Sequence, residues 1–228
     1  LGGDSLTSIG FVTEIYNELG ISITVNDIVK HPTIKELSDH LTTLSEKNTT
    51  STIQKVEKKK YYPASNAQKR MYYASSMDNN SVLYNIAGGI IVDNSLDISL
   101  LKQCFQSLIN RNEALRTHFE MIDNEIVQII EDKIDFTLSV DTLEAEDPSQ
   151  VYHDFVKPFD LAKAPLFRAK ITTLKDHRML LLLDMHHIIS DGTSLNILLQ
   201  ELCDLYNGKV LPEKQVDYKD FTLWEKEQ

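Results

Sequence analysis

An apolar run that ends in two adjacent histidines constrains the fold of this chain more than any other segment. Residues 179–183, Met-Leu-Leu-Leu-Leu, are too few to cross a membrane and predict a buried strand with His186 and His187 at its end. Because side chains alternate between the faces of a strand, the two imidazoles must point to opposite sides. At most one of them can therefore enter any given cavity.

The residues after the histidines predict a turn and then a helix. The chain turns at Asp191-Gly192, and leucines at helical spacing predict a helix over residues 193–206 that ends before Asn207-Gly208. Asp191 is placed to fix this turn, because its carboxylate can accept backbone N–H groups or pair with an arginine.

The composition is that of an ordinary folded protein of one or two domains. The chain has 228 residues, of which 42% are hydrophobic and 25% charged. Its net charge of −11 argues against nucleic acid or an anionic membrane as a partner. Cys104 and Cys203 fit the buried faces of helices and form no disulfide framework, which favours a reducing, cytoplasmic setting. They also lack ligand spacing, and with histidines that face apart no metal site is expected.

The N-terminal residues 1–44 predict a helical segment. Two glycines precede Ser5, which then begins a helix that ends at Gly20. Ser5 is either a simple N-cap or an exposed hydroxyl where the positive end of a helix can hold a phosphodiester. A short turn follows at residues 26–29, and Thr33 and Glu36 form a capping box that starts another helix. The first residues lack an initiator methionine, so we expect the chain to be part of a longer one.

Residues 45–60 predict a linker between two domains. They contain no aromatic residue and almost no apolar periodicity, so they cannot bury enough surface to offset the entropy of ordering. From residue 61 to residue 228 the composition becomes that of a globular domain. There the pattern predicts strands at 84–92 and 165–169, helices at 98–109 and 150–156, and a hairpin that turns at Asp123-Asn124.

Four short motifs in this second domain resemble the core motifs of condensation domains in nonribosomal peptide synthetases, in the same order. They are Ser-Asn-Ala-Gln-Lys-Arg-Met at 65–71, Arg-Asn-Glu-Ala-Leu-Arg-Thr-His-Phe at 111–119, His-His-Ile-Ile-Ser-Asp-Gly at 186–192 and Tyr-Lys-Asp-Phe-Thr-Leu-Trp at 218–224. Asn112 departs from the family's usual histidine. Leu-Gly-Gly-Asp-Ser-Leu at 1–6, followed by helices, likewise resembles the second part of a peptidyl carrier domain.

The resemblance implies an α/β (α+β) fold in which a chloramphenicol-acetyltransferase-like lobe has a mixed sheet flanked by helices. It implies that residues 1–44 are the end of a carrier domain and residues 61–228 the N-terminal lobe of a condensation domain. Ser5 would then carry 4′-phosphopantetheine, whose thiol holds an acyl group as a thioester. The condensation domain would form an amide bond between two carrier-bound substrates.

The same resemblance assigns roles to the histidine motif. It makes His187 the general base or the positioner of the incoming amine, a role that typically contributes a factor on the order of 10² to 10⁴ in rate. His186 is its neighbour, and the N–H of Gly192 faces the developing oxyanion. Asp191 is expected to form a structural salt bridge with Arg116, with Arg168 as the competing partner.

Three functions stay open on the sequence alone. The favoured one is condensation, with an L-residue donor indicated by the first and third motifs. An epimerization domain shares the histidine motif, and a noncatalytic docking fragment would be consistent with a single lobe. A cyclization domain is disfavoured because it has aspartate in place of the histidine pair.

Expected partners are carrier-bound aminoacyl or peptidyl thioesters, downstream acceptor carrier and adenylation domains and a phosphopantetheinyl transferase. The isolated fragment is expected to be inactive.

Overall fold

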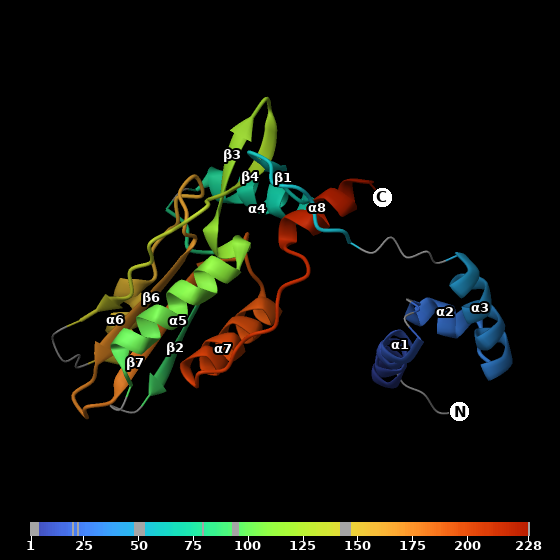
Figure 1. Cartoon of the computed structure of the whole chain (residues 1–228), viewed down its shortest axis with the longest axis horizontal. Coiled ribbons are helices and arrows are strands. Elements are labelled where there is room, and N and C mark those ends of the chain that lie inside the picture. Colours follow the sequence, from blue (N-terminus) through green and yellow to red (C-terminus); the bar gives the residue numbers. More distant parts are fainter. Residues whose placement is uncertain are drawn as a thin grey trace. The chain divides into compact units, whose positions relative to one another are not determined.

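The computed structural model describes residues 5–19, 21, 23–47, 53–78, 80–92, 96–141 and 147–227. By its contacts the chain divides into two compact units, residues 1–52 and residues 53–228 (Figure 1). The two glycines before Ser5 lie outside the described residues.

The first unit is helical throughout its described part, with α1 (Ser5–Leu19), α2 (Val25–Lys30) and α3 (Ile34–Lys47). Thr33 and Glu36 exchange backbone and side-chain hydrogen bonds at the start of α3, so the predicted capping box is confirmed. The turn predicted at residues 26–29 is wrong, because α2 is a short helix there with a capping box of its own. The three helices enclose a small core of Ile15, Ile23 and Leu37.

The second unit is built on a mixed sheet with the strand order β2-β7-β6-β5. Its central strands β7 (Met179–His186) and β6 (Phe167–Thr173) are antiparallel, as is β2 (Asn85–Val92) against β7, whereas β5 (Ser139–Val140) is parallel to β6. The predicted strand at 179–187 is therefore central and paired on both edges. Every residue of β7 after Met179 is buried, as its apolar run predicts.

Helices cover both faces of this sheet (Figure 1). On one face α5 (Ile98–Arg111) and α7 (Gly192–Tyr206) pack against Leu181, Leu183 and Met185. On the other face α6 (Pro148–Phe155) packs against Leu180 and Leu182. The alternation of β7 side chains thus separates two cores, and the predicted mixed sheet flanked by helices is confirmed.

A second, smaller sheet has the order β1-β4-β3, with β1 (Tyr62–Pro63), β4 (Glu125–Ile130) and β3 (Thr117–Ile122). Asp123 and Asn124 join β3 to β4 with φ of 51° and 63°, the pair of positive values that a tight two-residue hairpin needs. The helices beside this sheet are α4 (Asn66–Met77), the 3₁₀ helix η1 (Glu113–Arg116) and α8 (Tyr218–Glu227). The predicted hairpin turn is confirmed.

The segment predicted as a linker differs from a free tether at both of its described ends. Helix α3 continues to Lys47, and residues 53–60 already belong to the second unit. There the backbone N–H of Val56 donates to Asp220 at 2.9 Å, and that of Lys59 donates to the hydroxyl of Tyr62 at 2.8 Å.

Two further features bear on the predicted setting of the chain. Cys104 is buried in α5 as expected, but Cys203 is exposed on α7, so its predicted burial is wrong. Within the described residues, the helices are either too short or too polar to cross a membrane.

Candidate active site

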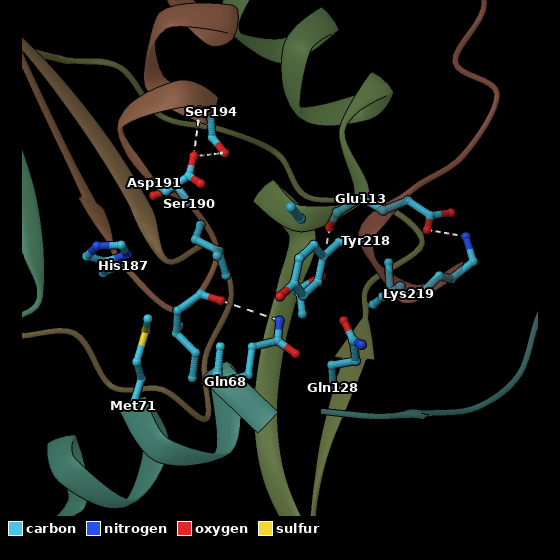
Figure 2. Close-up of a pocket in the computed structure, with 16 residues that line it drawn as sticks. Gln68, Met71, Glu113, Gln128, His187, Ser190, Asp191, Ser194, Tyr218 and Lys219 are labelled. Atoms are coloured by element: carbon cyan, nitrogen blue, oxygen red, sulfur yellow. Dashed lines mark hydrogen bonds and ion pairs between the residues drawn. The ribbon is translucent and has the colours of Figure 1, made fainter. Parts of the chain in front are cut away.

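Four segments far apart in the sequence line one pocket of about 190 Å³ (Figure 2). They are α4, η1 with the start of β3, the turn after β7 and the start of α8, which contribute most of the lining. Gln128 and Ile130 of β4 and Ser194 of α7 complete it. Each segment contains one of the four motifs found in the sequence. The fold therefore brings all four motifs to one cavity.

His187 reaches this pocket directly after β7 ends. Its backbone N–H donates to the carbonyl of Tyr84 at 2.7 Å, which anchors it beside the start of β2. The residue is half-buried and lines the pocket, while Nδ1 of its ring is buried without a hydrogen-bond partner among the described residues. A buried polar atom without a partner is an unusual feature of a folded protein. An imidazole can serve there as acceptor or donor.

His186 occupies the opposite face of β7 and lines a different cavity, of about 500 Å³, together with Ser75 and Phe159. The prediction that the two histidines point apart is therefore confirmed. The His186 side chain is only 4% exposed, and burial, together with the neighbouring His187, lowers its pKa to about 4. It is a neutral imidazole at physiological pH.

Asp191 caps helix α7. Its Oδ1 accepts the backbone N–H and the hydroxyl of Ser194, each at 2.7 Å, and these hydrogen bonds lower the pKa of the carboxyl group below its usual value. Asp191 therefore fixes the turn as predicted. It does so by accepting a backbone N–H group and not by pairing with an arginine.

The predicted salt bridge between Arg116 and Asp191 is wrong. Arg116 is buried where α5 and η1 meet, and its guanidinium donates to the backbone carbonyls of Ile109, Asn110, Glu131 and Asp132. Asp191 is exposed and already satisfied as a cap, so it needs no cation. The competing candidate, Arg168, pairs with Asp184 at 3.4 Å instead.

Gly192 is the first residue of α7 and is not among the residues that line the pocket. A Cβ built on it would meet no atom of the described residues within 4 Å, and its φ lies outside the left-handed region. Neither packing nor backbone conformation within the chain requires a glycine here. The predicted oxyanion role of its N–H stays a prediction.

Sequence reasoning missed several residues that shape the pocket. Lys219 is buried at one end of it and forms an ion pair with Glu113 (Figure 2). Burial acts to lower the pKa of Lys219, but the hydrogen bond and charge of Glu113 raise it above the usual value. Gln68 donates to the carbonyl of Ile188 at 3.4 Å and so ties α4 to the histidine turn. Lys219, Glu113 and Gln68 each belong to one of the four motifs, but membership in a motif does not predict these contacts.

Ser5 belongs to the other unit and is the first residue of α1. Its side chain lies outside what the structure describes. The N-terminus of a 15-residue helix carries partial positive charge and free N–H groups, so the backbone position of Ser5 fits a phosphodiester.

The fold and the pocket match a known class of protein. The chain belongs to the condensation domain family, which it matches over residues 58–228. Residues 1–41 match a second family, the phosphopantetheine attachment site.

The curated relatives are peptide synthases. The chain is 40% identical over 227 residues to bacitracin synthase 3 of Bacillus licheniformis, an alignment that covers 100% of the chain and 4% of the relative. It is 39% identical over 226 residues to tyrocidine synthase 2 of Brevibacillus parabrevis, covering 99% and 6%. The chain thus spans only a small part of these relatives.

Solved structures show the same fold at low sequence identity. The X-domain from teicoplanin biosynthesis is 18% identical with a TM-score of 0.68, over 77% of this chain and 40% of that one. The starter condensation domain of rhizomide synthetase RzmA is 19% identical with a TM-score of 0.65, over 74% and 45%. At these identities the likeness supports the fold alone.

Proposed function

We propose that this chain is part of a nonribosomal peptide synthetase and that its second unit takes part in amide-bond formation between carrier-bound substrates. One observation carries the proposal: the four motif segments contribute to the lining of a single pocket, and the half-buried His187 lies in that lining. The order of the two family matches and the names of the relatives support it.

His187 acts on the incoming amine in this proposal. As the nitrogen bonds to the thioester carbonyl and the C–S bond breaks, the nitrogen loses a proton, which the imidazole accepts before the leaving thiolate takes it up. The pocket also orients the two partners, and orientation supplies a large part of the barrier reduction in such a bimolecular reaction. Asp191 and Gln68 act on the backbone of the turn that holds His187 and not on substrate.

Ser5 is the proposed attachment site in the carrier segment, which we place in the first unit, with the lobe of the condensation domain beginning at residue 53. When bound to Ser5, 4′-phosphopantetheine supplies a thiol that carries the acyl group as a thioester. Incubation of the complete module with coenzyme A and a phosphopantetheinyl transferase should add the mass of the arm. Ser5→Ala should abolish this addition, and Ser8→Ala should not.

The central experiment removes the imidazole. In the complete module, His187→Ala should lower the rate of amide formation from donor and acceptor thioesters by a factor on the order of 10² to 10⁴. His153→Ala is the matched control, because His153 is exposed on α6 and lines none of the pockets described above. Amide formation at the wild-type rate in His187→Ala would contradict the proposal, and racemised donor without amide would identify an epimerization domain.

The proposal extends to the setting of the chain. The wording of the first and third motifs favours an L-residue donor. A downstream acceptor carrier, an adenylation domain and a cytoplasmic location are in keeping with this function. The chain covers 40–45% of the solved structures quoted above, so one lobe provides only part of the site. We therefore expect the 228-residue piece to form no amide when it is separated from the rest of the module.

A further inference from the structure

The ring of His186 is held in one orientation by a hydrogen bond at each of its two nitrogens. Its Nδ1 accepts the backbone N–H of Ile188 at 3.1 Å, so in the neutral ring the proton must be on Nε2. Nε2 lies 3.4 Å from Oγ of Ser75 in α4, which is therefore the acceptor of this hydrogen bond. The backbone N–H of Ile188 thus fixes the tautomer of His186, whether or not a substrate is bound.

Two aromatic rings also pack against the ring of His186. The ring of Tyr84 is tilted against His186 at a centroid distance of 6.0 Å, and the ring of Phe159 stands perpendicular to it at 6.2 Å. Tyr84 is also the residue whose carbonyl anchors the N–H of His187. The position of the His186 ring is therefore coupled to the backbone position of His187.

The ion pair of half-buried Arg168 with buried Asp184 lies next to Phe159. The guanidinium of Arg168 lies 3.7 Å from the centroid of the Phe159 ring and donates to the carbonyls of Lys157 and Pro158 at 3.0 and 3.2 Å. Its Nε is 3.4 Å from Asp184, which is fully buried and also accepts from Asn85. Because Arg168 contacts both the ring and its backbone, it fixes the segment that packs on His186.

We propose that Ser75 and Arg168 are positioning residues for condensation, which hold the His186 ring in its place and so fix the turn that presents His187. This inference rests on the proposed function, because it concerns the same reaction. Neither residue lines the His187 pocket, and neither belongs to any of the four motifs.

Ser75 gives the sharper test, because its neighbour is a matched control. Ser76 lines the same cavity, but its hydroxyl donates to the carbonyl of Tyr72 within α4. In the complete module, Ser75→Ala should lower kcat of amide formation roughly fivefold to tenfold at unchanged KM, the effect of one lost hydrogen bond. Ser75→Thr keeps the hydroxyl and should restore most of the rate, and Ser76→Ala should leave kcat within a factor of about two.

Arg168→Lys provides a second, independent variant. It keeps the charge beside Asp184 but cannot hold two carbonyls and the ring together, so kcat should fall on the order of tenfold, again at unchanged KM. Lys170→Met is its control, since Lys170 lies two residues further along β6 and pairs with Asp141 instead. Thermal unfolding of every variant separates a loss of folded protein from a loss of rate.

The outcomes separate this inference from the proposed function. If wild-type module forms no amide, the proposed function fails. If wild type is active but Ser75→Ala matches Ser76→Ala, or Ser75→Thr fails to restore the rate, the positioning role is wrong. An increase in KM without a change in kcat would also overturn it, because a positioning residue acts on the reacting geometry and not on binding.

Discussion

Asp184 and His186 are both buried on the same face of β7, and their pKa values are shifted in opposite directions. Burial raises the pKa of Asp184 to about 6, although Arg168 and Asn85 act against this, and burial lowers the pKa of His186 to about 4. Between about pH 4 and 6, folding therefore takes up a proton at Asp184 and releases one at His186. As pH rises through this range, the titration of Asp184 lowers the free energy of unfolding and the titration of His186 raises it.

We expect the two contributions to offset each other in the wild-type chain. Asp184→Asn leaves only His186, so the free energy of unfolding should rise with pH between about 4 and 6, by on the order of 2 kcal/mol relative to wild type. His186→Asn leaves only Asp184 and should produce the opposite slope. Urea unfolding across this pH range measures both. Parallel profiles for wild type and both variants would show that neither group titrates as the structure indicates.

Helix α7 and strand β7 show which elements sequence patterns predict well. The apolar run has the length of a buried strand, and the leucines recur at the spacing of a helix. The predicted ranges 179–187 and 193–206 therefore agree with Met179–His186 and Gly192–Tyr206. The partner of Arg116 was predicted wrongly because it depends on where α5 and η1 bring backbone carbonyls together. No local pattern encodes that convergence.

The cap of α7 gives a prediction at the same scale. Asp191→Ala removes the acceptor of the Ser194 N–H and should lower the free energy of unfolding by about 1 kcal/mol, whereas Asp191→Asn should keep most of it. Because Arg116 makes no ion pair with Asp191, the effects of Asp191→Asn and Arg116→Met should add to within about 0.5 kcal/mol in a double-mutant cycle. A coupling clearly above that value would restore the salt bridge expected from the sequence.

At the scale of the whole molecule, all four motifs contribute to the lining of the His187 pocket, but they do not account for what supports it. Each motif contributes residues to the pocket lining, so their shared cavity follows from their membership in one family fold. Ser75 and Arg168 carry no pattern of their own, and their contacts arise only when α4, β6 and β7 are assembled. The same limit applies to residues 53–60, whose polar composition predicts a tether although they contact the second unit.

Residues 53–60 therefore offer a prediction about how the second unit begins. Replacing them in the full chain with a glycine–serine stretch of equal length keeps the spacing and the backbone N–H donors. It removes the half-buried side chains of Ile53 and Val56 and raises the entropy of the segment in the unfolded state. The second unit should lose on the order of 1 kcal/mol of stability in urea unfolding. Lys58→Ala is the matched control, since the exposed pair of Lys58 with Asp132 should contribute little. Equal stability of the replaced and original chains would mean that the segment is a tether over its whole length, as its composition alone predicts.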